Sequence, residues 1–158
     1  MTNKISNFLL IILFVLTTSC GFKTLDYANI DNFKIEKIES SGYQRANFLI
    51  KNDLKQSSRE NSSNVITIDI NTTKERNVKE RKLNRKVVKN EVIISANYSI
   101  YFIGKNKTHE SSFSSSADYI VNKSFANSLR TERKLEKNLT KNISNFILKD
   151  INAIINDF

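Results

Sequence analysis

Twelve residues in the middle of the chain, Val92–Ile103, constrain the fold most, because polar and apolar side chains alternate along them. Ser95, Asn97 and Ser99 share one parity, and the other parity is apolar, aromatic or small throughout. A period of two places these sets on opposite faces of a β-strand. One face of this strand must therefore be covered by apolar side chains from elsewhere in the chain.

Three further segments have the pattern of strands. Residues 65–72 carry β-branched side chains at alternate positions, and residues 108–121 alternate again after a turn at 104–106. This turn predicts an antiparallel hairpin. Residues 33–40 form a shorter predicted strand, in which the alternation fails by one residue near its end.

Residues 74–89 precede the central strand and are dominated by charge, with ten charged residues out of sixteen, eight of them basic. We expect them to form the outer part of a long hairpin. A helix is the alternative, because Val78 and Leu83 lie loosely on one helical face and Lys, Glu and Arg tolerate either conformation.

Two segments have helical spacing instead. Residues 43–55 place Ala46, Ile50 and Leu54 on one side. An apolar stripe from Leu129 to Ile154 predicts a final helix that begins after Ser124 or Ser128, ends near Asn156, and is about 29 residues or roughly 43 Å long.

The predicted order of elements is β-α-β-β-β-α. Helices of these lengths can cover all the apolar strand faces from one side. The sequence therefore predicts an α+β fold, a two-layer sandwich of two helices packed on a mainly antiparallel four-stranded sheet, formed by residues 33–158 as a single domain.

The N-terminus has the layout of a secretory signal peptide. Lys4 precedes an unbroken apolar run at residues 8–16, which is too short at about 14 Å to span a bilayer. Small residues follow, and then the single cysteine, Cys20, in an arrangement that resembles a bacterial lipobox, although Thr17 stands where an apolar residue is preferred. We expect residues 1–19 to be a lipoprotein signal peptide.

Cys20 would then be acylated and begin the mature protein, with residues 20–32 as a lipidated tether. The alternative is an incidental thiol near an ordinary cleavage site. A lone cysteine cannot form an intrachain disulfide, and a free thiol is unfavourable in an oxidising compartment. Two or more acyl chains, palmitate among them, would anchor the protein stably in a membrane.

The chain is basic, with 25 Lys and Arg against 16 Asp and Glu and a formal charge of +9. Inside a cell this balance would indicate a nucleic-acid partner. An exported lipoprotein meets anionic lipid and sugar phosphate instead, so we expect no nucleic acid. An AT-rich genome, which favours Lys, Asn and Ile, is an alternative source of the charge.

No residue pattern predicts an enzyme, a metal site or a cofactor. His109 has no cysteine or carboxylate pair near it and is expected at the surface. The serines at 111–116 lack a nucleophile elbow. Glu132 and Glu136 lie one helical turn apart among Lys and Arg, so we expect a solvated ion-pair face rather than a catalytic pair.

Three local strings occur in an order that resembles LptE, the lipopolysaccharide-assembly lipoprotein family of Gram-negative bacteria. They are Cys20–Lys23, Ala96–Ile100, and Phe125–Arg130 followed by Glu132 and Leu139. The resemblance implies a plug inside an LptD-type β-barrel. It also implies a lipid anchor at the periplasmic face of the outer membrane, and binding of lipopolysaccharide during its assembly at the cell surface.

The basic hairpin end is the predicted lipopolysaccharide contact, because Lys and Arg side chains neutralise clustered phosphates. The predicted residues are Arg76, Arg81, Lys82, Arg85 and Lys86. The alternative is a hairpin face that is solvated or turned toward the barrel wall. The strand face with Ser95, Asn97, Ser99 and Tyr101 is polar enough for a water-lined lumen, or for plain solvent.

Two other functions remain open. The first is a lipid-anchored pilot or assembly chaperone for another envelope secretion complex, and the second is an anchored hydrolase, which lacks a candidate nucleophile and base. Gly21, directly after Cys20, is not the aspartate that marks inner-membrane retention in some bacteria, which favours the outer membrane.

Overall fold

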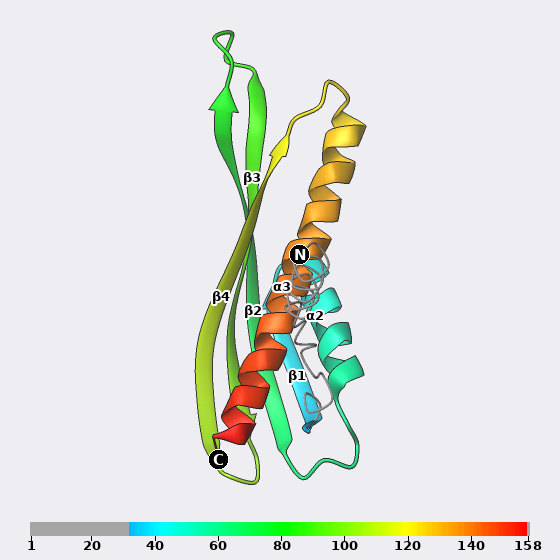
Figure 1. Cartoon of the computed structure of the whole chain (residues 1–158), viewed down its shortest axis with the longest axis vertical. Coiled ribbons are helices and arrows are strands. Elements are labelled where there is room, and N and C mark those ends of the chain that lie inside the picture. The colour runs from blue at the N-terminus through cyan, green and yellow to red at the C-terminus, as the bar shows by residue number, and fades with distance from the viewer. Residues whose placement is uncertain (1–31, 158) are drawn as a thin grey trace, which may run out of the picture.

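Four strands and two helices make up most of residues 32–157, which the structure, a computed structural model, describes (Figure 1). The elements are β1 (Lys34–Gly42), α2 (Gln44–Ser57), β2 (Val65–Arg81), β3 (Val87–Phe102), β4 (Lys107–Ile120) and α3 (Phe125–Asn156). The predicted order and the α+β class are confirmed. The predicted signal peptide, Cys20 and nearly all of the tether lie outside the described residues.

The sheet has the strand order β1-β2-β3-β4. Strands β2, β3 and β4 pair antiparallel, whereas β1 pairs parallel with β2, because α2 connects them as a crossover. The register of β1 shifts between Ile35 and Lys37. This bulge accounts for the break in alternation that the sequence shows there.

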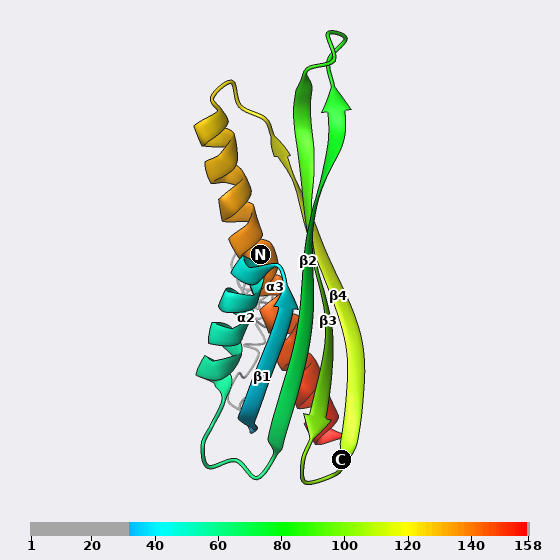
Figure 2. The ribbon, with the colours of Figure 1, turned by 180° about the vertical axis from the view of Figure 1, so that it is seen from behind.

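Both helices lie on one side of the sheet (Figure 2), where α2 packs on β1 and β2 and α3 packs on β3 and β4. Half of the buried apolar side chains between them are Ile, and Ile68, Ile100 and Ile147 are fully buried. Each such side chain contributes about 1.5–3 kcal/mol on burial. Within residues 32–157, the buried apolar side chains form one cluster that runs from Phe33 to Ile151.

Glycine is required where β1 turns into α2. Gly42 has φ of +87°, and a Cβ atom there would lie 1.9 Å from the Thr72 carbonyl oxygen. The Tyr43 N–H donates to that same oxygen at 2.9 Å, and the Thr72 hydroxyl donates to Asn47 Oδ1 at 2.8 Å. These bonds fix Tyr43 at the start of α2.

The charged segment 74–89 forms the outer part of a hairpin, as predicted, with strand on both sides of a turn at residues 82–86 and no helix. Strands β2 and β3 stay paired as far as Arg81 and Val87. Strand β4 ends earlier, with Ile120 opposite Lys89, so the hairpin projects beyond it as a two-stranded ribbon (Figures 1 and 2).

Helix α3 is 32 residues long, with Ser124 at the N-cap position and Asn156 at its end. Its sheet-facing side changes character along its length. Toward its start the buried residues are Ser128, Glu132 and Glu136. From Leu139 onward they are mostly apolar, comprising Leu139, Ile143, Ile147 and Ile151 with the polar residues Thr140 and Ser144. No helix in the described part of the chain combines the length and apolar character needed to cross a membrane.

Candidate binding surface at the hairpin end

A hydrogen-bonded turn closes the hairpin. The Arg85 N–H donates to the Lys82 carbonyl at 2.8 Å, and the Lys82 N–H donates to the Lys86 carbonyl at 2.9 Å. Asn84 Oδ1 accepts the Lys86 N–H at 3.2 Å. Arg85 has φ of 64°, in the left-handed region that residues with a Cβ seldom adopt. The turn therefore has a defined shape and presents its side chains outward.

Four of the predicted contact residues, Arg81, Lys82, Arg85 and Lys86, lie together and exposed at this tip. None of them forms an ion pair with an acidic side chain of residues 32–157. Lower on the hairpin the cations are paired, as in the 2.9 Å contact of Lys79 with Glu91. Four cations without acidic partners in residues 32–157 are thus grouped at the tip, where Arg81 Nη1 also donates to the Arg85 carbonyl at 3.3 Å.

The fifth predicted residue, Arg76, does not join this group. It lies opposite Val92, five residues or about 17 Å along the strand from Arg81. Its Nη1 donates to Glu132 Oε2 at 3.3 Å. A hydrogen bond with Tyr119, and the charge of Glu132, raise the pKa of the guanidinium. Arg76 therefore belongs to the attachment of α3 at the hairpin base.

Glu132 and Glu136 are 4% and 3% exposed, so the prediction of a solvated ion-pair face is wrong. Both carboxylates accept hydrogen bonds from Lys74 of β2, the one to Glu132 Oε1 at 2.6 Å. Tyr119 donates to Glu132 Oε2 at 2.7 Å, and Tyr43 donates to Glu136 Oε2 at 3.0 Å. These partners come from other elements of the fold, which local helix spacing cannot reveal.

The surroundings of Glu132 and Lys74 favour the charged form of each. Burial by itself raises the pKa of Glu132, but hydrogen bonds from Lys74 and Tyr119, with the charges of Lys74 and Arg76, leave that pKa below its ordinary value. Burial lowers the pKa of Lys74, yet hydrogen bonds to both glutamates raise it overall. A general acid needs a carboxyl that stays protonated near neutral pH. The cluster instead acts as an ionic clamp between α3 and β2.

His109 is 38% exposed, close to the expected surface position, but it has a partner that the sequence did not reveal. Its Nε2 lies 3.0 Å from Asp150 Oδ2, which also accepts the Tyr98 hydroxyl at 2.6 Å. These contacts join the end of α3 to β3 and β4. Among residues 32–157, no three His, Cys, Asp or Glu side chains are grouped to hold a metal ion.

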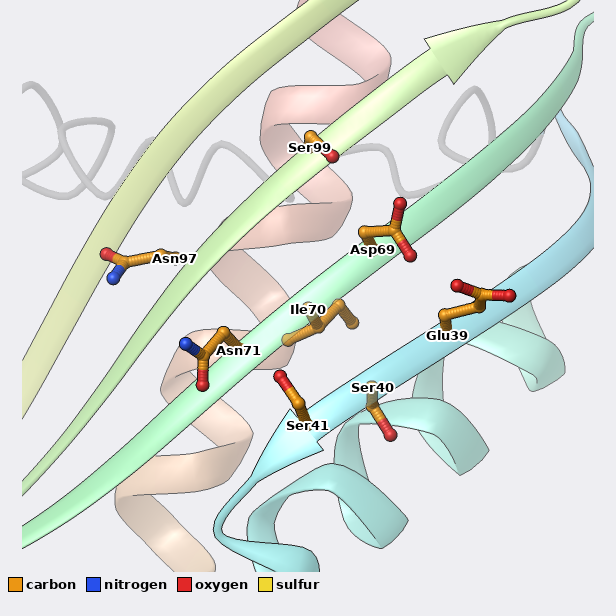
Figure 3. A pocket seen from close by; sticks show the side chains of 8 residues that line it. All are labelled: Glu39, Ser40, Ser41, Asp69, Ile70, Asn71, Asn97 and Ser99. Atoms are coloured by element: carbon orange, nitrogen blue, oxygen red, sulfur yellow. The ribbon is translucent and has the colours of Figure 1, made fainter.

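The face of the sheet opposite the helices is polar, as predicted. A hollow of about 450 Å³ on it is formed by β1, β2 and β3 (Figure 3). Its polar lining comprises Glu39, Ser40, Ser41, Asp69, Asn71, Asn97 and Ser99. Ser99 and Asn97 are two of the residues that the sequence placed on the uncovered face.

Exposed apolar side chains at the hairpin end were missed. Leu83 at the turn is fully exposed, and Ile120 and Phe125 are more than two-thirds exposed near the end of β4 and the start of α3. An apolar residue between Lys82 and Arg85 in a turn was the available signal for Leu83. The hairpin end is thus both cationic and apolar.

No protein-family model matches the chain, and no curated protein matches it in sequence. Solved structures match its fold. Rare lipoprotein B from Shewanella oneidensis is 16% identical with a TM-score of 0.61, and the match covers 77% of this chain and 97% of that one. Lipoprotein B from Nitrosomonas europaea is 12% identical with a TM-score of 0.56, over 80% and 88% of the two chains. These likenesses establish a shared fold.

Proposed function

We propose that this chain is a lipid-anchored outer-membrane protein of the LptE type. It plugs an LptD-type β-barrel from the periplasmic face, binds lipopolysaccharide and assists its assembly at the cell surface. The observation that carries the proposal is the group of Arg81, Lys82, Arg85 and Lys86 at the end of a projecting hairpin, without acidic partners in the described chain. The shared fold with rare lipoprotein B, another name for LptE, supports it.

The chemistry of the tip suits a phosphorylated glycolipid. Arg81 and Arg85 can each bind a phosphate through two parallel N–H donors, and Lys82 and Lys86 add point charges beside them. Such contacts form without first breaking an ion pair within the described protein. Leu83 lies in the same turn and provides an apolar surface next to the charges.

The plug role is supported by the uncovered sheet face. A permanent complex commonly buries more than about 2,000 Å². The face opposite the helices is broad, and it carries hydroxyl and amide side chains such as Ser95 and Asn97, which suit the hydrated interior of a barrel.

Charge reversal at the tip tests lipopolysaccharide binding. Replacing Arg81, Lys82, Arg85 and Lys86 by Glu should weaken binding by the purified protein by more than about tenfold. A matched control reverses Lys51, Lys55, Lys137 and Lys149, which changes the net charge equally while leaving the tip intact. Equal binding by wild type and the tip variant would refute the tip as the contact.

Recovery of the native partner tests the barrel assignment. Purification of the tagged lipoprotein from native membranes should yield a large outer-membrane β-barrel and bound lipopolysaccharide, identified by mass spectrometry. A secretin or pilus component in place of the barrel would support a pilot role in another secretion complex and contradict the proposed function.

Mass spectrometry of the mature N-terminus should show acylation of Cys20.

A further inference from the structure

The two borders of the sheet differ in how they are protected. Strand β1 is nine residues long, has a bulge between Ile35 and Lys37, and carries a charged pair at Lys37 and Glu39. Such features block the pairing of an edge strand with other chains. Strand β4 is fourteen residues long, pairs with β3 without any register shift, and contains no proline. The border formed by β4 has neither the bulge nor the short length of β1, and its acidic residues Glu110 and Asp118 leave the uncharged stretch Ser111–Ala117 between them.

The hydrogen-bond pattern shows which groups lie along this border. The Val121 N–H donates to the Val88 carbonyl at 2.9 Å, which identifies one bonded pair of the β3–β4 ladder. Bonded pairs alternate in an antiparallel ladder, so odd-numbered residues of β4 direct their N–H groups toward β3. Even-numbered residues from Thr108 to Ile120 direct theirs outward. Within residues 32–157, no strand pairs with them.

An apolar strip runs beside this border on the helix side. Phe113 of β4 stacks on Phe146 of α3 with ring centroids 4.1 Å apart, yet both remain only partly buried. Ala117 and Leu135 are partly buried as well. A strand added to β4 would place alternate side chains over this strip. The matching occupant is an extended segment with apolar residues at every second position.

A second copy of the chain fits this edge poorly. Two β4 strands paired antiparallel about Ser114 would place Glu110 directly opposite Asp118 at both ends of the ladder. Like charges at opposed positions destabilise a strand pair. The occupant is therefore expected to be a different polypeptide.

We propose that β4 is a docking edge on which an extended segment of the barrel partner adds as a fifth strand, an inference that rests on the proposed function. The segment hydrogen-bonds to the outward groups of Thr108–Ile120 and covers Phe113 and Phe146 with its alternate apolar side chains. Main-chain bonds would provide the affinity, and the apolar strip would select the sequence.

Proline substitutions on β4 can test docking at this edge without disrupting the fold. Ser112→Pro and Ser116→Pro each remove one N–H group that points away from β3, and neither removes a hydrogen bond between β3 and β4. Thermal stability should therefore change little, because proline is tolerated at such positions of an edge strand. The double variant should retain less than about a tenth of the barrel that wild type co-purifies from native membranes. The double alanine variant keeps both N–H groups and should behave as wild type.

Amide exchange provides the second measurement. In the isolated mature lipoprotein the even-numbered amides of β4 should exchange quickly, and in the barrel complex they should be protected, while the odd-numbered amides are protected in both. Barrel recovery unaffected by both prolines, or even-numbered amides still exposed in the complex, would overturn the docking edge alone. Protection in the isolated monomer, or a homodimer through β4, would also overturn it. If wild type recovers no barrel, the proposed function fails, and the docking edge fails with it.

Discussion

Lys74 holds two buried carboxylates, and its removal would leave both without their main partner. An uncompensated buried charge costs about 3–5 kcal/mol. We therefore expect Lys74→Met, which keeps the side-chain volume, to lower the free energy of unfolding in urea by about 3 kcal/mol or more. The control is Lys79→Met, because the Lys79 side chain is 45% exposed and its pair with Glu91 should be screened by water and cost about 1 kcal/mol or less. Equal losses would show that the cluster is not a buried clamp.

Glu132 gives this clamp a pH dependence of defined sign. Its pKa in the folded protein lies below the ordinary value of 4.5, so its contribution to stability is present above that value and is lost as the pH falls through the folded pKa. Glu132→Gln should therefore reduce the loss of unfolding free energy on acidification from about pH 6 to 3. Glu75→Gln, at an exposed position of β2, should follow wild type. Identical pH profiles of the Glu132 variant and wild type would contradict this role.

The ion-pair partners of Glu132 and Glu136 could not be predicted from the sequence. The spacing of Glu132 and Glu136 and their basic neighbours were visible, but local spacing suggests partners within α3. The observed partners are Lys74, Tyr43 and Tyr119, of which Lys74 is 58 residues away from Glu132. The contact of His109 with Asp150 was missed for the same reason, because it forms only when the end of α3 reaches β4.

At the scale of elements, residues 74–89 show how flanking structure determines an ambiguous segment. Their composition tolerates helix or strand. The strands on both sides are already paired, and the ladder continues toward the tip as far as Arg81 and Val87, with register shifts between Val78 and Glu80 and between Glu80 and Arg81. The bulge in β1 was visible as a break in alternation. The parallel pairing of β1 was not specified by the predicted sheet, although a helix between two strands allows it.

The turn at the hairpin tip allows a matched pair of substitutions. Arg85→Gly relieves a left-handed conformation and should stabilise the hairpin by about 1 kcal/mol. Arg81→Gly places glycine in a strand and should destabilise it by about 0.5–1 kcal/mol. Each removes one tip charge, so both should weaken lipopolysaccharide binding. Amide exchange of the hairpin checks the opposite stability effects, and equal exchange rates would contradict them.

At the scale of the whole molecule, body cations such as Lys34, Lys74 and Lys89 have acidic partners, whereas the four cations grouped at the projecting end have none within residues 32–157. Binding through an exposed cationic tip should weaken as salt rises from about 0.05 to 0.5 M, because screening shortens the Debye length. The four-residue charge-reversal variant should show little salt dependence. A salt-independent affinity of wild type would indicate that apolar contacts dominate.

The change in the buried side of α3 predicts how the family of such sequences can diverge. Apolar positions such as Ile143 and Ile147 tolerate exchange among residues of similar volume for less than about 1.5 kcal/mol each, so they can drift one at a time. Lys74, Glu132 and Glu136 are more constrained, since each single loss removes at least one ion pair of this cluster at a mostly buried position. Among sequences that share this fold, these three positions should therefore change together more often than the apolar positions around them.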